Sequence, residues 1–264
     1  ALSKMGFRFF GFIMILLFVR SPSDGWIILL SNSLSSALIC LYLFQEMTKR
    51  IGRISIVKPS QAIIVFNKSK YSFLITIIPV IYQNISMITL SLFVNPIQLG
   101  FYYGINRIYR AFNTLYGPLG QAFYPRVASI GHDKFELKLL IIKFFWVMVS
   151  VGLVFFVITV LFSDLMIGIL LGEQYLPASN VLKIFGIVLP LTAISHVLGR
   201  QWLLSLEKDF QYAFSQFISS LIAFILLLSM IEKFGIISIP VSLIVFEFIS
   251  IITILIIIRY IVNK

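Results

Sequence analysis

The sequence predicts an all-α membrane protein with about eight transmembrane helices, each near the length of about 20 apolar residues that a bilayer requires. Two properties of the composition support this fold class. Of the 264 residues, 59% are hydrophobic and only 12% are charged, whereas about 25% of a typical soluble domain is charged. The chain also contains 26 Phe residues and long runs of Ile and Leu. Its helices therefore cannot all present a water-facing surface.

Eight apolar stretches are long enough to cross a membrane, and short polar connections separate them. In order, they cover residues 2–19, 26–44, 71–94, 99–123, 139–162, 181–206, 210–231 and 236–258. The first follows Lys4 and Arg8 and therefore resembles a signal peptide, but the polar segment RSPSD stands where a cleavage site would be expected. We interpret this stretch as a true span, and we expect further sequence upstream of it.

The later stretches are bounded by equally clear signals. A basic strip, residues 46–70, separates the second from the third and is the longest connection. Asn95-Pro96 separates the third from the fourth, and the sequence EKFG separates the seventh from the eighth. Several spans contain an internal proline, and kinked helices are tolerated in a membrane where they line a cavity or where neighbours satisfy the freed backbone groups.

Basic residues sort to one side of the eight predicted spans. The positive-inside rule assigns that side to the cytoplasm, and both termini lie on it. It carries Lys4, Arg8, Lys49, Arg50, Arg53, Lys58, Lys68, Lys70, Arg126, Lys134, Lys138, Lys208, Arg259 and Lys264, whereas the other side carries Arg20 and Lys233. Topology thus explains most of the net charge of +11, and we expect membrane lipids and no nucleic acid among the partners.

Arg107 and Arg110 lie near the middle of the fourth stretch, about one helical turn apart. A charged side chain at bilayer depth costs roughly 2.5–3.5 kcal/mol on insertion scales, and a guanidinium stays charged at any physiological pH. At a rise of 1.5 Å per residue, the two residues lie about 12 and 16 Å below the surface. Two interpretations are open. In the first, carbonyl groups or a carboxylate of another helix hold the two arginines in a structural role; in the second, the arginines line a cavity that binds an anion.

A polar stripe runs along the same stretch at helical spacing. The opposite face, which includes Ile105, Ile108 and Phe112, is apolar and is predicted to face lipid. The polar face should therefore meet protein or water. The stripe consists of Tyr103, Asn106, Arg107, Arg110, Asn113, Thr114, Gly117 and Gln121. The third stretch carries an uncharged stripe that contains Gln83, with Asn84 beside it; this pattern fits hydrogen bonds between helices and a cavity lining equally well.

Glu247 is the one carboxylate deep inside a predicted span. An intramembrane acid is a functional candidate by default. It either forms an ion pair with Arg107 or Arg110, or takes up a proton during transport. In the sixth stretch, Arg200 follows His196 by four residues near the cytoplasmic edge, where it reaches either the lipid headgroups or the mouth of a cavity.

The sequence offers little for an enzymatic or metal-dependent mechanism. The single cysteine, Cys40, lies in an apolar run, so a disulfide framework and a thiol motif are excluded. The spacing of the acidic, His and Cys residues matches no metal-binding motif, and the sequence contains no glycine-rich phosphate loop. We therefore expect no cofactor, no bound metal and no enzymatic activity.

Two segments resemble Wzx-type O-antigen and polysaccharide flippases, which belong to a superfamily that includes MATE exporters. The segment LGFYYGINRIYRAFNTLYGPLGQAFYPRVAS is similar to their eighth span and the loop after it. The segment LLGEQYLPASNVLKIFGIVLPLTAISHVLGRQWLLSLEKDFQY is similar to their ninth-to-tenth connection and tenth span. The resemblance implies a twelve-helix, two-lobe transporter of the bacterial inner membrane with both termini cytoplasmic. Residues 1–45 would be the last two helices of the N-terminal lobe, residues 46–70 a cytoplasmic inter-lobe loop, and residues 71–264 the six-helix C-terminal lobe.

The resemblance also implies a function: flipping an undecaprenyl-diphosphate-linked oligosaccharide, with a polysaccharide polymerase and a chain-length regulator as candidate partners. The diphosphate would bind Arg107 and Arg110, and Glu247 would couple transport to an ion. Further substrate contacts would come from Tyr103, Asn106, Asn113, Gln83, Asn84 and Arg200. The alternatives are a MATE-type exporter of cationic drugs, whose cavity should be acidic, and a membrane polymerase or ligase, which would need a large outside loop.

Overall fold

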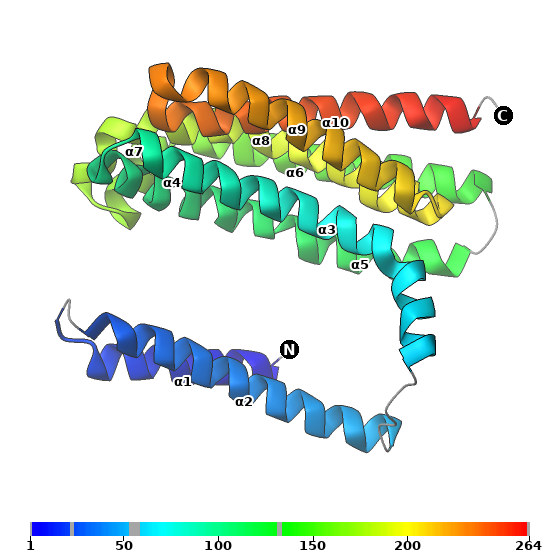
Figure 1. The fold of residues 1–264 in the computed structure, drawn as a ribbon, viewed down its shortest axis with the longest axis horizontal. Coiled ribbons are helices and arrows are strands. Elements are labelled where there is room, and N and C mark those ends of the chain that lie inside the picture. Colours follow the sequence, from blue (N-terminus) through cyan, green and yellow to red (C-terminus); the bar gives the residue numbers. More distant parts are fainter. Residues whose placement is uncertain (1, 22–23, 53–58, 131–133, 263–264) are drawn as a thin grey trace. The chain divides into compact units, whose positions relative to one another are not determined.

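The computed structural model describes residues 2–21, 24–52, 59–130 and 134–262. Every regular element within these residues is a helix (Figure 1), which confirms the predicted all-α fold. The chain divides into two compact units, Ala1–Val65 and Phe66–Lys264. Each unit has its own packing and is described by itself.

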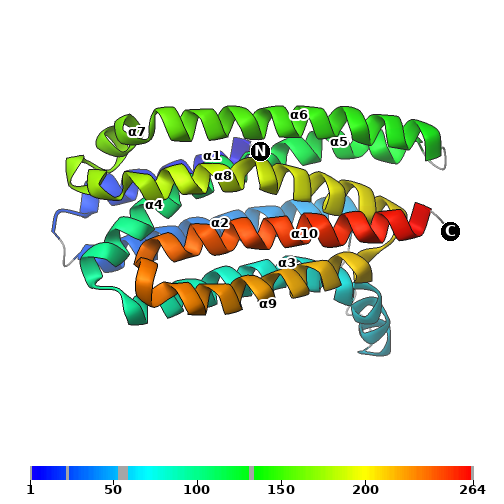
Figure 2. The ribbon, with the colours of Figure 1, turned by 90° about the horizontal axis from the view of Figure 1, so that it is seen from above.

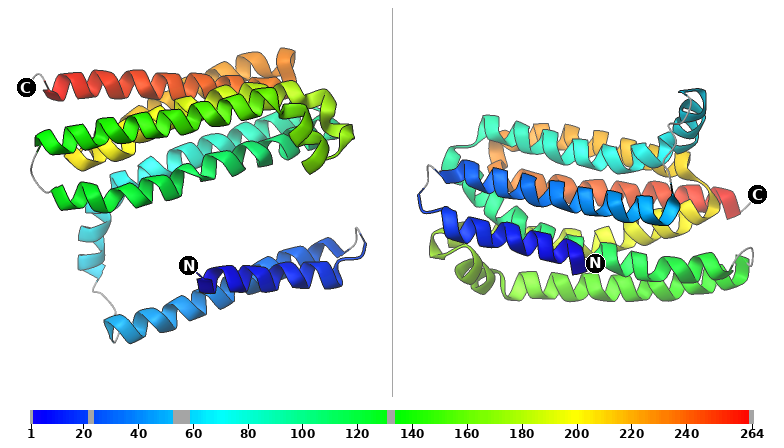
Figure 3. Two further views of the ribbon diagram at one scale, coloured as in Figure 1. Left: turned by 180° about the vertical axis from the view of Figure 1, so that it is seen from behind. Right: turned by 90° about the horizontal axis from the view of Figure 1, so that it is seen from below.

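The first unit is mainly a pair of antiparallel helices, α1 (Leu2–Phe18) and α2 (Gly25–Ile51) (Figure 3). The two helices approach closely where Gly11 faces Ser35, because a Cβ on Gly11 would overlap the Ser35 hydroxyl. Small residues at a contact allow the backbones of membrane helices to approach in this way. Glycine at this position therefore permits the packing of α1 on α2.

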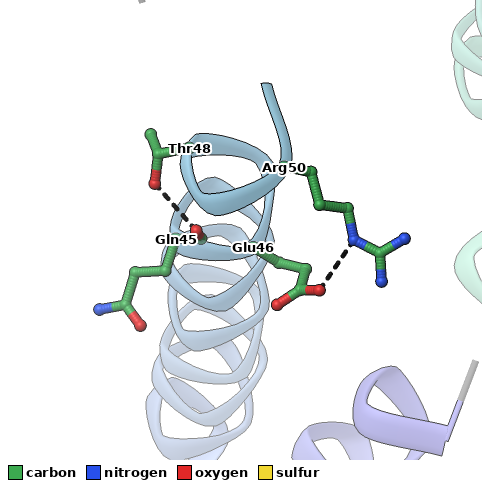
Figure 4. Close-up of polar contacts among 4 residues, drawn as sticks. All are labelled: Gln45, Glu46, Thr48 and Arg50. Carbon is green, nitrogen blue, oxygen red and sulfur yellow. Dashed lines mark hydrogen bonds and ion pairs between the residues drawn. The ribbon is translucent and has the colours of Figure 1, made fainter. Parts of the chain in front are cut away.

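Helix α2 continues into the predicted loop of residues 46–70. Near its end, Glu46 and Arg50 form an ion pair at 2.9 Å, and the Thr48 hydroxyl donates a hydrogen bond to the Gln45 carbonyl at 2.8 Å (Figure 4). Opposite charges four residues apart stabilise a helix, and basic residues in the last turn interact favourably with its dipole. These interactions explain why α2 does not end with its apolar stretch.

Helix α3 (Pro59–Phe93) begins before its apolar stretch. Proline suits the first helical position, because its fixed φ is helical and its missing N–H would have no partner there. With α2 reaching Ile51 and α3 beginning at Pro59, most of the expected 46–70 loop is helical. Residues 53–58 of that loop lie outside the described residues.

The second unit contains the rest of α3 and the later helices. They are α4 (Pro96–Thr114), α5 (Tyr116–Ile130), α6 (Lys134–Leu161), α7 (Ser163–Leu170), the 3₁₀ helix η2 (Glu173–Ala178), α8 (Ser179–His196), the π-helix η3 (Val197–Leu203), the 3₁₀ helix η4 (Leu204–Leu206), α9 (Asp209–Phe234), the 3₁₀ helix η5 (Gly235–Ile237) and α10 (Ser238–Val262).

These helices form two layers. One layer runs in the order α6, α8, α10 and α9 (Figure 2). The other consists of α3, α4 and α5, with α4 packed on α8 and α5 packed on α6 (Figure 1). Aromatic pairs join the layers: Tyr109 stacks on Phe185 with ring centroids 4.5 Å apart, and Phe123 stacks on Phe144 at 3.9 Å. Such pairs add about 0.5–1.5 kcal/mol each beyond the area they bury.

Five segments of the described residues are long and apolar enough to cross a membrane. They are Gly25–Arg50, Ser69–Phe93, Glu136–Leu161, Glu173–Leu206 and Asp209–Tyr260, of which the last contains both α9 and α10. The protein is therefore a multi-pass membrane protein. All predicted spans except residues 2–19 and 99–123 match these segments, two of them extending one residue beyond. Helix α1 forms in the first of the two exceptions and has 17 residues.

The fourth predicted span, residues 99–123, is not one continuous helix, which corrects the prediction. Helix α4 ends at Thr114, α5 begins at Tyr116, and Leu115 lies between them. Pro118 explains the interruption. Proline has no backbone N–H, and its ring clashes with the carbonyl four residues earlier in a regular helix, which here belongs to Thr114.

Gly152 lies at a tight contact between α6 and α8. A Cβ at this position would lie 2.8 Å from the Cα of Pro190 and 3.2 Å from the Cβ of Ala193. We expect Gly152→Val to lower the thermal unfolding midpoint of the purified protein, because overpacking typically costs about 1–3 kcal/mol. Gly168→Ala is the control, since nothing lies within 4 Å of its added Cβ. Equal midpoints for the two variants would contradict the packing.

Candidate functional site

A cavity of about 340 Å³ lies inside the second unit, between the two helix layers. Helices α3, α4 and α5 form one wall, and α8, η3, α9 and α10 form the other. The lining residues are Ile75, Pro79, Tyr82, Gln83, Tyr109, Asn113, Thr114, Tyr116, Gly117, Thr192, Ser195, His196, Arg200, Tyr212, Gln216, Leu243, Phe246 and Glu247. Polar side chains from nearly every long helix of the unit thus meet in one place.

Glu247 on α10 is 7% exposed and lines this cavity. The Thr192 hydroxyl donates a hydrogen bond to its Oε1 atom at 2.8 Å, and the Ser195 hydroxyl donates to its Oε2 atom. No Lys or Arg of the described residues forms an ion pair with it, so the expected pairing with Arg107 or Arg110 is wrong. Hydroxyl groups both donate and accept; the same two side chains can therefore bind the carboxylate or its protonated form.

His196 and Arg200 line the cavity from α8 and η3. The Nδ1 atom of His196 is buried and has no hydrogen-bond partner within the described part of the chain. The exposed Arg200 side chain lies beside the Tyr212 hydroxyl on α9. Of the two environments predicted for Arg200, the structure shows the cavity. The π-helix that carries it is a rare element that often occurs at functional sites.

The polar stripe of α4 is divided between the cavity and the exposed surface. Asn113 lines the cavity, and Asn106 is only 6% exposed. Both predicted anion-binding arginines are exposed. The Nη2 atom of Arg110 donates to the Gln83 Oε1 atom at 3.5 Å, whereas Arg107 has no hydrogen-bond or ion-pair partner among the described side chains. The two arginines therefore do not both point into the large cavity.

A small void of about 10 Å³ adjoins the cavity beside Arg110. Asn106 lines it as well, and Gln83, Tyr82 and Tyr109 line both the void and the cavity. Its volume is close to the minimum that holds one water molecule. Arg110 and Asn106 therefore lie at the edge of the cavity and not in its centre.

The apolar face of α4 packs against protein, which corrects the prediction that it faces lipid. Ile105 and Ile108 are buried, and Tyr109 stacks on Phe185 of α8. Tyr103 on the polar stripe is exposed instead and lies outside the cavity lining. An amphipathic pattern identifies two faces, and in this unit the apolar face contributes to the core.

The two polar residues predicted on α3 have different roles. Gln83 lines the cavity, but Asn84 is exposed and donates its amide hydrogen to the Val80 carbonyl of its own helix at 2.8 Å. Elsewhere on α3, the Ser72 hydroxyl donates to Asp209 of α9 at 3.3 Å. The stripe therefore serves both expected purposes, and Asn84 does not belong to the site.

Several lining residues were not singled out from the sequence. Thr192 and Ser195 bind the Glu247 carboxylate, and Gln216 brings an amide from α9. A signal for the first two was present: together with His196 and Arg200 they recur at helical spacing along an otherwise apolar span. Gln216 and Tyr212 belong to a similar stripe, because they recur with Ser215 and Ser219 at helical spacing on the next span.

A family comparison complements this geometry. The model of a family described as polysaccharide biosynthesis protein matches residues 5–180, more than half of the chain. The chain belongs to the polysaccharide biosynthesis protein family. Comparisons with curated proteins and with solved structures give no significant match. As a multi-pass membrane member of this family, the protein has a role in polysaccharide synthesis or transport.

In this polysaccharide biosynthesis protein, the cavity combines several kinds of binding group. A carboxylate, a guanidinium, an imidazole, amides and tyrosine hydroxyls all reach it. No group of three or more His, Cys, Asp and Glu side chains suitable for a metal comes together among the described residues. The arrangement is chemically suited to bind a ligand rich in hydroxyl groups and to exchange a proton or cation at Glu247.

Proposed function

We propose that this polysaccharide biosynthesis protein is a flippase that carries an undecaprenyl-diphosphate-linked oligosaccharide, an O-antigen unit or a related repeat, across the bacterial inner membrane by alternating access. One observation carries the proposal: a polar cavity lies inside an otherwise apolar, membrane-spanning helical unit. A glycan cannot cross hydrocarbon unaided, since each polar group buried without a hydrogen bond costs about 2–7 kcal/mol. The lining offers hydroxyl, amide and charged partners for such groups.

The proposed binding site for the diphosphate is the exposed arginine pair on α4. Arg107 has no carboxylate partner among the described residues, and Arg110 contacts only the neutral Gln83. Both guanidinium groups are therefore available to an anion, and their fork of donors matches phosphate oxygens. Sugar hydroxyls would contact Asn113, Gln83 and Arg200 in or beside the cavity.

Glu247 is the proposed ion-coupling residue. Its two hydroxyl partners can accommodate a protonated or an ionised carboxyl group, and no Lys or Arg within the described ranges forms an ion pair with it. Uptake and release of one proton or cation at this position would favour one conformation over another, as coupled transport requires. We further propose that the protein works with a polysaccharide polymerase and a chain-length regulator, has no cofactor and is not itself an enzyme.

Complementation of a flippase-null bacterial strain tests the proposal. Expression of the complete protein should restore a surface glycan ladder on a gel, with a blot confirming its presence in the membrane. A second strain, which lacks a glycosyltransferase of the same glycan, provides the control, because a flippase should not restore its glycan ladder. Rescue of the second strain and not of the first would indicate an enzyme instead.

A second candidate function is export of an organic cation. The observation in its favour is the combination of Glu247 with the aromatic rings of Tyr82, Tyr109 and Phe246 in one cavity, since aromatic faces attract cations. Arg200 in the same cavity opposes it by like-charge repulsion. Ethidium accumulation in cells that lack their own exporters distinguishes the two functions: a cation exporter lowers it, and the proposed flippase leaves it unchanged.

The membrane orientation gives a separate prediction. In a Cys40→Ala background, Lys233→Cys lies in the last turn of α9 on the predicted outer side, and Lys49→Cys lies in the last turn of α2 on the predicted cytoplasmic side. Both lysines are exposed, which makes the variants a matched pair. An impermeant maleimide added to intact spheroplasts should label only the first. Labelling of the second alone would reverse the proposed orientation.

A further inference from the structure

An apolar groove of about 280 Å³ lies between α3 and α9, apart from the polar cavity. Its walls are Ile78, Ile81 and Ile85 on one helix and Phe217, Leu221 and Phe224 on the other. Each set repeats at three- and four-residue intervals, so each is one continuous helix face. Both helices belong to segments long and apolar enough to cross a membrane. The groove therefore opens where the surroundings are hydrocarbon.

Helices α3 and α9 touch at one end, and the groove lies between them further along. At the touching end, Tyr71 and Phe210 pack edge to face with ring centroids 5.2 Å apart, and Ser72 donates to Asp209 at 3.3 Å. Along the rest of its length the α3 backbone approaches other helices at few positions. The groove is thus a gap that follows the end at which the two helices are fixed to each other.

The groove offers no unpaired hydrogen-bond donor. Its two polar lining residues are Tyr82 and Ser220. The Ser220 hydroxyl donates to the Phe217 carbonyl of its own helix at 2.8 Å, and the Tyr82 hydroxyl donates to Ser242 at 2.8 Å. A polar ligand would find no partner here, whereas a hydrocarbon chain loses nothing by entering. The chemistry of the groove is that of an alkyl or isoprenyl chain.

Tyr82 lies between the groove and the polar cavity. Its side chain lines both, and its ring is stacked on Phe246 with centroids 5.3 Å apart. The groove and the cavity therefore adjoin on the two sides of this side chain. We propose that the groove between α3 and α9 binds the polyprenyl tail of the transported lipid, while the diphosphate contacts Arg107 and Arg110 and the sugars reach the cavity. This inference rests on the proposed flippase function.

The tail site is expected to orient the lipid more than to strengthen its binding. Moving a tail from bilayer to groove gains little hydrophobic free energy, because lipid chains are as apolar as the lining. What remains is van der Waals packing, which is small for each atom pair and adds up along a chain. Blocking the groove should therefore reduce transport several-fold and leave binding of the diphosphate largely intact.

Photocrosslinking tests the site without requiring transport. A photoreactive amino acid replaces Leu221 in the complete protein, held in nanodiscs of phosphatidylethanolamine and phosphatidylglycerol with radiolabelled undecaprenyl diphosphate. We expect a labelled adduct that excess unlabelled undecaprenyl diphosphate suppresses and extra phospholipid does not. The control position is Ile222, which is exposed on the same helix, points to a different side from Leu221 because it is one residue further along, and lies outside the groove. Equal adducts at both positions, or an adduct that phospholipid suppresses equally well, would overturn the proposal in favour of bulk lipid.

A filling substitution provides the second measurement. Ile81→Trp should lower both the competable adduct and glycan display several-fold at unchanged membrane abundance. Val80→Trp should lower neither, because Val80 is exposed on a different side of the same helix and lies outside the groove. The two proposals fail separately. A specific adduct from a protein that does not rescue the flippase-null strain refutes the flippase alone. If the wild-type protein rescues the strain but forms no specific adduct, the tail site alone is refuted. Full rescue by the Ile81→Trp variant would refute it as well.

Discussion

Replacing Arg107 and Arg110 together with alanine should abolish surface glycan display and leave the membrane abundance of the complete protein near wild type. Abundance should hold because both side chains are exposed and neither pairs with a carboxylate among the described residues, so no buried charge is left without a partner. Each charge-assisted hydrogen bond contributes about 1.5–3 kcal/mol. Loss of two would weaken diphosphate binding about 10²–10⁴-fold.

Substitutions that keep or reverse the charge refine this result. Lysine at either position should restore part of the glycan ladder, since it supplies a point charge without the bidentate fork, and glutamate should restore none. Arg20→Ala removes an exposed arginine from the turn after α1 and is the control for a general loss of positive charge. A full ladder from the double alanine variant at normal abundance would return Arg107 and Arg110 to a structural role.

Glu247→Gln should uncouple transport from the ion gradient without reducing the folded yield. Glutamine has nearly the same shape, and the Thr192 and Ser195 hydroxyls can turn to serve its amide as they serve the carboxylate. The yield should hold because no ion pair is broken; removal of one partner of a buried pair would cost about 3–5 kcal/mol. Transport should become independent of the proton or cation gradient, measured by glycan display with and without an ionophore.

Glu247→Leu tests whether the hydrogen bonds of Glu247 contribute to the folded yield. Leucine removes the carboxylate that accepts from both hydroxyl groups, and the Ser195 hydroxyl keeps only its weaker bond to the Thr192 carbonyl at 3.2 Å. A lost buried hydrogen bond costs about 0.5–1.5 kcal/mol, so the yield should fall relative to glutamine. A glutamine variant with low yield would reveal a structural role for the carboxylate. Normal yield together with normal gradient dependence would leave Glu247 with neither role.

The helices were predictable because hydropathy alone decides which stretches are apolar enough to lie in a bilayer. The apolar pattern did not predict the interruption at Leu115, which Pro118 explains. It also did not predict that α2 extends through Glu46 and Arg50, since this turn is polar and contains an ion pair. Polar helix ends obey local electrostatics, which a search for apolar runs overlooks.

Charged side chains within apolar stretches gave the clearest signal for the candidate site. Glu247 and Arg200 stood out for this reason and line the cavity, as do Gln83 and Asn113, which the polar stripes identified. Thr192 did not stand out, because a single hydroxyl is unremarkable in a membrane helix. The ion pair with the α4 arginines failed for a different reason: helical spacing shows which residues share a face, but not which neighbour that face meets. The same limitation placed Ile105 toward lipid instead of the core.

Transbilayer movement of the lipid-linked oligosaccharide in sealed proteoliposomes tests the flippase proposal most directly. The complete protein is reconstituted with a labelled undecaprenyl-diphosphate oligosaccharide on the inner leaflet, and its arrival outside is followed with an impermeant glycosidase. We expect rapid exposure with the wild-type protein, and exposure at the protein-free rate with the double alanine variant of Arg107 and Arg110. Wild-type protein that is folded and monodisperse yet moves the lipid no faster than empty vesicles would contradict it.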